Sequence, residues 1–238
     1  MEQINALRFV IEGSFCSFRD PNGAKYQQTY WFPPKTTVIG FLGSALGLEP
    51  PELEPLYDLL RVGVVLESWQ GFARDLWGYT KLKGSAKAES AVVIRELIYQ
   101  PRYAIFVSAS DETELTKLQS ALLDPVFALR FGRGEDLAII DGQPEIVQVE
   151  SMDESPWLSW TLLPFTLQNQ KYMFQLAENQ PLRHRLPIPT RMPVRLRYDK
   201  NWVRTAEFSW VTQVFDLPIK LVSSEGIWTD GQYTFSFI

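Results

Sequence analysis

The chain of 238 residues has 28 acidic and 23 basic residues, which give a formal net charge of −5. An apolar fraction of 45%, with 13% aromatic residues, excludes a disordered chain and is enough for a sizeable core. No apolar run approaches the ~20 residues of a membrane helix, and the N-terminus does not resemble a signal segment, so we expect a soluble, cytoplasmic protein. Cys16 is the only cysteine, which excludes an intramolecular disulfide and a thiolate metal cluster.

The charges are unevenly distributed along the sequence. Acidic residues dominate 49–58 and 135–154, whereas basic residues dominate 183–204. The cations of this basic run are Arg183, Arg185, Arg191, Arg195, Arg197, Lys200 and Arg204. A local basic patch can bind phosphate whatever the net charge, but the same pattern is typical of solvated strand faces, and both interpretations remain open.

The first elements are a strand and a helix that contains glycines. Apolar and polar residues alternate over 7–11, which predicts a strand that ends at Gly13. Helical spacing follows over 38–47, with Thr36 or Thr37 as a candidate N-cap and Gly47 as the left-handed residue after the last turn. The glycines at 40, 43 and 47 share one side of this helix, which suits either close packing or room for a ligand.

The later elements complete an α+β pattern. Strands are predicted over 62–67, 91–98 and 103–109, a helix over 111–123 with Asp111 as its cap, and a strand over 127–131. This order approximates the βαββαβ pattern of ferredoxin-like (RRM-like) folds, with an insertion before the third strand. Turn dipeptides at 141–142 and 230–231 predict a β-rich remainder. We therefore expect a ferredoxin-like domain over 1–140, with an insertion at 68–90, and a β-rich region over 141–238.

Residues 69–90 combine aromatic rings with cations. Trp69, Phe72, Trp77 and Tyr79 alternate with Arg74, Lys81, Lys83 and Lys87. Rings of this kind stack on splayed bases while cations meet phosphates. The alternative is that the rings belong to the core and the lysines form a solvated tip.

The segment Gly132-Arg133-Gly134 predicts a loop in which a backbone can approach closely.

The chain offers little enzymatic chemistry. His184 is the only histidine, so a histidine-based triad or metal site would have to use it. It could serve as the base of a metal-independent ribonuclease, or it could be a surface or RNA-contacting residue in a basic loop. The carboxylates show no metal-binding spacing, and we expect no metal and no cofactor.

Several of these segments carry a family resemblance. The run SFRDPNG…YQQTYWFPPKTTVIGFLGSALGL resembles the N-terminal signature of the CRISPR-associated Cas-five family, part of the RAMP group of RNA-binding proteins. Its Ser-Phe-Arg step, Pro-Pro-x-Thr-Thr segment and glycine-bearing helix are residues 17–19, 33–37 and 38–47. The run VIRELIYQPRYAIFV looks like the family's paired central strands, here 91–98 and 103–109, and DPVFALRFGRGEDL looks like its Leu-Gly-Arg segment. The resemblance covers about residues 5–140, and the C-terminal third matches only loosely.

The resemblance implies a non-catalytic subunit of Cascade, the type I CRISPR surveillance ribonucleoprotein of antiviral defence, and we favour type I-B. Such a subunit binds and caps the 5′ handle of crRNA, with a thumb-like hairpin, here 68–90, crossing the RNA. The implied partners are crRNA, the backbone subunits, the large PAM-reading subunit and, through the complex, target DNA. No membrane contact is expected.

The implied RNA contacts fall on cations, hydroxyls and rings. They are Arg19, Tyr30, Lys35, Thr36, Thr37, Arg74, Trp77, Tyr79, Lys81, Lys83, Lys87, Arg133, Arg183 and Arg185. Some relatives process pre-crRNA themselves, with tyrosine, lysine and histidine in the ferredoxin-like body. This chain has no histidine in residues 1–183, which argues against that activity. A pre-crRNA endoribonuclease remains the alternative, and a β-rich ligand-binding protein unrelated to CRISPR is a third hypothesis that rests on the acidic net charge.

Overall fold

The computed structural model describes residues 2–23, 26–83, 87–164, 172–174, 185–201 and 203–238. Arg183 and His184 lie outside these residues, and the side chains of Lys81, Lys83 and Lys87 are likewise not described. No helix in the described ranges is long and apolar enough to cross a membrane.

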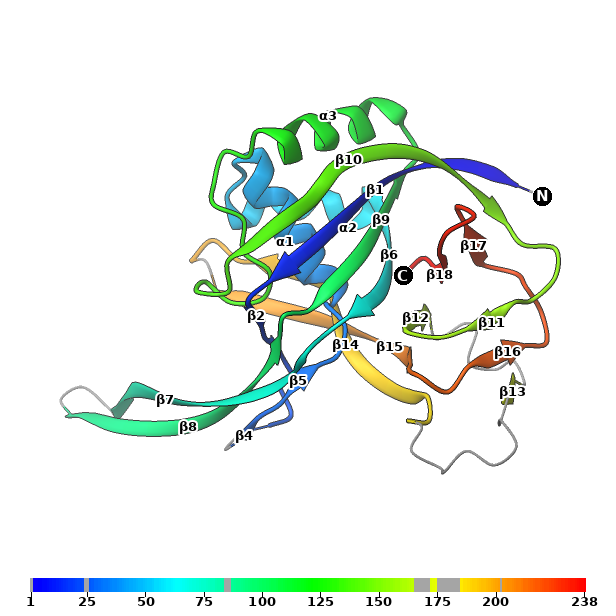
Figure 1. The fold of residues 1–238 in the computed structure, drawn as a ribbon. Coiled ribbons are helices and arrows are strands. Elements are labelled where there is room, and N and C mark those ends of the chain that lie inside the picture. Colours follow the sequence, from blue (N-terminus) through cyan, green and yellow to red (C-terminus); the bar gives the residue numbers. More distant parts are fainter. Residues whose placement is uncertain (1, 24–25, 84–86, 165–171, 175–184, 202) are drawn as a thin grey trace.

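The centre of the molecule is a ferredoxin-like unit, which confirms the predicted α+β fold. Its elements are β1 (Gln3–Gly13), α1 (Lys35–Leu46), β6 (Leu60–Ser68), β9 (Arg102–Ala109), α3 (Glu112–Leu123) and β10 (Ala138–Ser151). The strands pair antiparallel in the order β6-β9-β1-β10. Both helices lie on one face of this sheet (Figure 1).

The main core fills the space between the sheet and its helices. The predicted alternation in β1 places Leu7, Phe9 and Ile11 in this core, where each is at most 1% exposed. The opposite sheet face buries a smaller cluster around Ala6 and Phe106, because the last strands of the chain cover it. A sheet buried on both faces must be apolar on both, which explains why the alternation in β1 is incomplete.

The C-terminal region is β-rich, as predicted, but it does not form a separate sheet. Beyond β6 the sheet continues through β12 (Thr161–Pro164), β15 (Arg204–Val214) and β14 (Ile188–Tyr198), and beyond β10 through β17 (Ile227–Thr229) and β18 (Thr234–Ser236). A small sheet joins β11 (Trp157–Leu158), β16 (Ile219–Leu221) and β13 (Tyr172–Phe174). The predicted boundary at residue 140 falls inside β10, so the two regions share one sheet.

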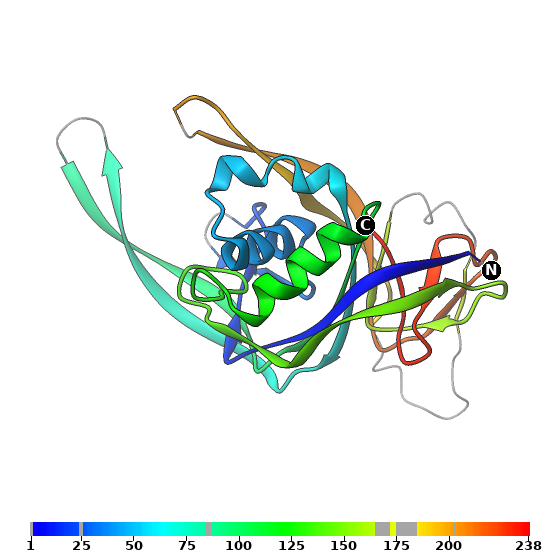
Figure 2. The same ribbon diagram turned by 90° about the horizontal axis from the view of Figure 1, so that it is seen from above.

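The insertion is a long hairpin of β7 (Gly71–Lys83) and β8 (Lys87–Tyr99), which we call the thumb. It projects from the body (Figure 1), and the β14–β15 hairpin, in orange, projects toward the same side (Figure 2). The prediction that 91–98 pairs with 103–109 is wrong, because these residues form the inner part of β8 and pair with β7. At its root β8 also pairs with β2 (Phe15–Cys16) and β4 (Tyr26–Gln27), while β3 (Phe18–Arg19) pairs with β5 (Thr29–Tyr30).

Two further sequence predictions are wrong. Residues 127–131 form no strand, because the N–H groups of Val126 and Phe127 instead donate to the Ala45 and Ser44 carbonyls at the end of α1, at 3.0 and 3.1 Å. The dipeptide at 141–142 is not a turn but lies within β10, where Gly142 has φ 76° and the register with β1 shifts, as in a β-bulge. The turn at 230–231 is confirmed between β17 and β18.

Helix α1 begins earlier than predicted. Its N-cap is Pro34, so neither Thr36 nor Thr37 is the cap, and both lie in the first turn. At its other end Gly47 adopts φ 76° and the Leu48 N–H donates to the Gly43 carbonyl at 2.9 Å, which confirms the predicted C-terminus. The chain continues through η1 (Pro50–Leu53) and α2 (Leu56–Leu59) into β6. Asp111 caps α3, as predicted, by accepting from the Thr113 N–H.

Candidate nucleic-acid interface

Two adjoining hollows, of about 580 and 400 Å³, lie between α1, the 131–136 loop and the β14–β15 hairpin. We call them together the basic groove. Both hollows are lined by the same set of side chains and glycines: Arg19, Thr36, Thr37, Gly132, Arg133, Gly134 and Pro193. The structure thus brings together four of the predicted RNA contacts, although Arg133 lies 114 residues after Arg19 in the sequence.

The larger hollow is strongly basic. Its lining includes Arg19, Arg130, Arg133 and Arg204, and none of its described lining residues is acidic. Sequence reasoning missed Arg130 and did not single out Arg204 from the basic run. Guanidinium groups that converge on one groove create a local positive potential, which the net charge of −5 does not cancel. They also match the fork geometry of phosphate oxygens.

Arg133 is held in place by contacts to both its backbone and its side chain. Its N–H donates to Asp136 Oδ2 at 3.0 Å, and its guanidinium donates to the Gln27 side chain. Burial lowers the pKa of Arg133, and the like charge of Arg95 adds to this effect. The loop approaches closely at Gly132, where φ is 126° and an added Cβ would lie 2.8 Å from both the Ser17 carbonyl and Asp136 Oδ2. Gly132 therefore allows the loop to pack closely against the protein's own backbone at Ser17.

The first turn of α1 lies at the wall of the groove. Thr36 and Thr37 line both hollows, and the Thr36 backbone N–H has no hydrogen-bond partner among the described residues. The N-terminus of a helix favours a phosphate through its free N–H groups and its dipole. This end of α1 therefore adds polar groups suited to phosphate to the basic groove.

Two predicted contacts do not reach the groove. Lys35 lines neither hollow; burial lowers its pKa, and the nearby charges of Arg195 and Arg61 lower it further. Tyr30 is only 3% exposed and its hydroxyl donates to the Arg191 carbonyl at 2.7 Å. A ring that is buried in this way cannot stack on a base, so the structure does not support that role for Tyr30.

The thumb turns one of its two faces toward the groove. The register sets Asp75 opposite Arg95 and Trp77 opposite Val93, so these four side chains share a face. Trp77 lines the smaller hollow and is 40% exposed, and its ring stacks with Tyr79 at 5.8 Å. The Trp77 ring also lies 5.2 Å from the Arg133 guanidinium and 5.6 Å from that of Arg95.

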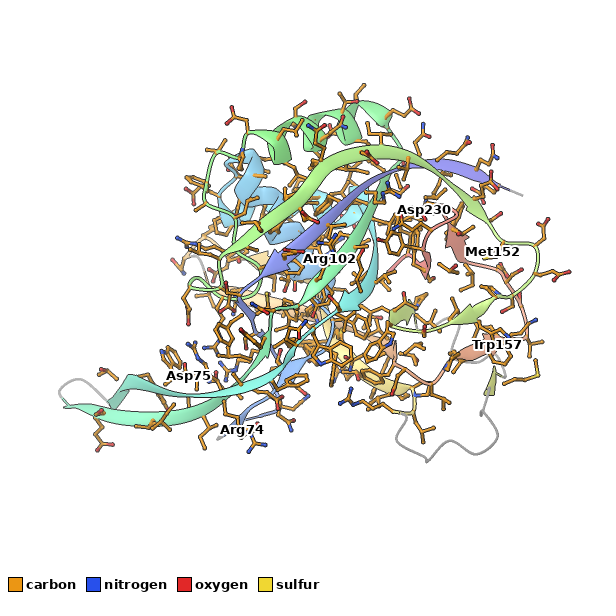
Figure 3. The ribbon with its side chains drawn as sticks, in the orientation of Figure 1. Arg74, Asp75, Arg102, Met152, Trp157 and Asp230 are labelled. Atoms are coloured by element: carbon orange, nitrogen blue, oxygen red, sulfur yellow. The ribbon has the colours of Figure 1, made fainter. Side chains whose placement is uncertain are left out.

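The other face of the thumb points away from the groove. Figure 3 shows Arg74 and Asp75 on opposite sides of the hairpin, and the Arg74 guanidinium lies 5.7 Å from the ring of Tyr26. Arg74 therefore does not join Trp77 in the groove. The exposed side chains of Leu76, Val92 and Ile94 share the Arg74 face. Of the predicted thumb contacts with described side chains, the structure brings Trp77 to the groove and places Tyr79 beside it.

The aromatic residues of the insertion divide between the two sequence interpretations. Trp69 and Phe72 pack against Trp31 at 5.3 and 4.5 Å, so their rings anchor the thumb to the body, although Phe72 remains 38% exposed. Arg185 lies over the same Trp31 ring at 4.0 Å and lines neither hollow. The exposed rings of Trp77 and Tyr79, which stack on each other, suit a base.

The basic run also divides into two parts. Arg195 pairs with Asp58 of α2, and Arg197 pairs with Glu54 at 3.0 Å and with Glu207. Acidic and basic segments recognised separately in the sequence thus neutralise each other in the fold. Arg204 instead lines the groove, and no ion pair to it is found in the described part of the chain.

Among the residues that the structure describes, no group of three or more His, Cys, Asp or Glu side chains is placed to hold a metal ion.

Comparisons with known proteins agree with this architecture. A solved chain described as "CRISPR RNA-guided surveillance complex" is 12% identical, with a TM-score of 0.53 over 90% of this chain and 91% of that one. A CRISPR protein from Archaeoglobus fulgidus is 13% identical, with a TM-score of 0.51 over 98% of each chain. At these identities the similarity shows the fold alone. A comparison with curated protein sequences gives no match.

The family assignment comes from the sequence itself. The family model described as "CRISPR-associated protein (Cas_Cas5)" matches residues 6–206, which include the Ser-Phe-Arg step, α1, the thumb and the 131–136 loop. This confirms the resemblance that the N-terminal signature indicated. The chain belongs to the CRISPR-associated Cas_Cas5 family.

Proposed function

We propose that this chain is the non-catalytic subunit of a type I crRNA-guided surveillance complex that binds and caps the 5′ handle of crRNA. Its family membership and its likeness in fold to a chain of a CRISPR RNA-guided surveillance complex support this proposal. The partners are then crRNA, the backbone subunits and the large PAM-reading subunit. Target DNA is reached through the complex and is recognised by base pairing with the guide.

The observation that carries the proposal is the basic groove. Four arginines line its larger hollow, with no acidic residue among the described lining residues of that hollow, and the exposed Trp77 ring lines the smaller one. Single-stranded RNA offers phosphates and unstacked bases together, and proteins bind it with cations beside exposed rings. The groove and the thumb face have these two features side by side.

The test is RNA binding by the assembled complex. The complex is reconstituted with Arg19→Ala, Arg130→Ala and Arg133→Ala combined in this subunit, and crRNA retention is measured across a salt series. We expect weaker retention and a salt slope reduced by about one for each lost phosphate contact. Lys117→Ala on α3 is the matched control, because Lys117 is exposed and lies away from the groove. Unchanged retention in the triple variant, with the complex intact, rejects the proposal.

A second experiment separates binding from cleavage. The cleavage alternative rests on His184, which lies outside the described residues. Purified chain is incubated with repeat RNA in the presence of a chelator, and the RNA is examined on a denaturing gel. We expect intact RNA. Metal-independent cleavage that disappears in His184→Ala would replace the binding role with pre-crRNA processing.

A further inference from the structure

The β14–β15 hairpin gives the basic groove an apolar wall. In the register of these strands Phe208 lies opposite Pro193, and Ala206 lies opposite Leu196. All four residues line the larger hollow. Arg204, two residues before Ala206 on the same strand face, also lines it. The hollow therefore has a flat apolar surface on one side and cations around it.

Phe208 is the aromatic residue of the larger hollow whose ring is not fully buried. Phe41 and Phe208 are the aromatic side chains among its described lining residues. Phe41 is 1% exposed and packs against Phe9 and Phe131, so its ring is already covered. Phe208 is half-buried, and the guanidinium of Arg191 lies 5.5 Å from its ring centroid. Its environment resembles a stacking platform more than a core position.

We propose that one base of the bound RNA stacks on Phe208 while the adjoining phosphates meet the arginines of the larger hollow. The inference rests on the proposed RNA-binding function and adds a residue and a contact to it. The ligand must combine a flat apolar face with negative charge a few ångströms away, which is the chemistry of a nucleotide. The hollow of about 580 Å³ lies in the range of natural small-ligand sites. Phe208 lies outside residues 6–206, to which the family model is matched.

The experiment reconstitutes the complex with this subunit and measures the affinity of the complex for single-stranded repeat RNA from its CRISPR array. Phe208→Ala should bind about 5- to 150-fold more weakly, the range expected for loss of one base–ring stack. Phe208→Tyr should bind normally. Phe208→Leu preserves apolar packing without a ring and should be as weak as Phe208→Ala, with an unchanged melting temperature. Trp157→Ala is the matched control, because that ring is 43% exposed and lies on the small C-terminal sheet (Figure 3).

An abasic scan identifies the stacked nucleotide. Each nucleotide of the RNA is replaced in turn by an abasic one, and the effect of Phe208→Ala is measured again. At one position the two losses should not add, because each change removes the same stack. Equal affinity of Phe208→Ala and wild type, or additivity at every position, overturns the inference but leaves the groove proposal intact. Failure of the wild type to bind any repeat RNA overturns both.

Discussion

The carboxylate of Asp136 accepts a hydrogen bond from the backbone N–H of Ser17 at 3.0 Å, across 119 residues of chain. The same oxygen accepts from the Arg133 N–H, also at 3.0 Å. One buried side chain therefore fixes the 131–136 loop to the connection between β2 and β3. Arg19 lies two residues after Ser17 in β3 and the loop carries Arg133, so the contact sets how far apart two groove cations lie.

Asp136→Ala should destabilise the protein by about 2–4 kcal/mol, because two N–H groups lose their acceptor and the Ser17 N–H is buried. Asp136→Asn preserves an acceptor oxygen and should cost less. Chemical denaturation measures both values. Asp124→Ala, at the exposed end of α3, is the control and should change stability by no more than about 0.5 kcal/mol. Equal stability of Asp136→Ala and wild type would show that the two bonds do not hold the loop.

The same carboxylate should make stability depend on pH. Burial raises the pKa of Asp136 above its ordinary value of 3.8, and the N–H bonds from Arg133 and Ser17 only partly oppose this. The folded chain therefore holds the proton more tightly than the unfolded chain, and stability falls as pH rises from 3.8 through the folded pKa. Asp136→Asn should flatten this part of the curve of melting temperature against pH. An unchanged slope would mean that Asp136 does not titrate there.

Local sequence rules predicted the elements whose causes are local. The alternation of β1, the capping of α3 by Asp111 and the left-handed Gly47 all depend on residues within one or two turns, and all three are confirmed. The order βαββαβ followed from these elements. The family signature added the expectation of a thumb at 68–90, and in the structure the hairpin spans residues 71–99.

The errors came from partners distant in the sequence. Residues 127–131 have strand-like composition, but the N–H groups of Val126 and Phe127 donate hydrogen bonds to the last carbonyls of α1 instead. Nothing in the sequence distinguishes Arg195, which meets Asp58, from Arg204, which lines the groove. These outcomes depend on which surfaces the fold brings together, so a one-dimensional pattern could not predict them.

Arg195 and Arg204 should therefore respond differently to the same substitution. Arg195→Ala removes an ion pair with Asp58 and should lower stability by about 0.5–1 kcal/mol, while the salt slope of RNA binding stays the same. Arg204→Ala should lower the RNA affinity and the slope, with little effect on stability. A fluorescence anisotropy titration at several salt concentrations, together with thermal denaturation, compares the two variants. Identical profiles would contradict the division of the basic run.

Lys35 should destabilise the fold and should not contact RNA. Its folded-state pKa is lowered by burial and by the charges of Arg195 and Arg61, so the charged form destabilises the fold at neutral pH. Lys35→Met should raise the melting temperature at pH 7, and the gain should shrink as pH rises toward the ordinary lysine value of 10.5. RNA affinity should not change. A loss of affinity without a gain in stability would restore Lys35 as a phosphate contact.

The glycines of α1 should give opposite results although they lie three residues apart. An added Cβ at Gly40 would meet no atom within 4 Å, because this residue lines the groove, so Gly40→Ala should stabilise the helix by about 1 kcal/mol. At Gly43 the new methyl would overlap the buried Leu53 side chain. Overpacking costs about 1–3 kcal/mol, so Gly43→Ala should be destabilising despite the gain in helix propensity. Urea denaturation of both variants provides the comparison, and a shift of the same sign for both would mean that η1 does not pack on α1 as described.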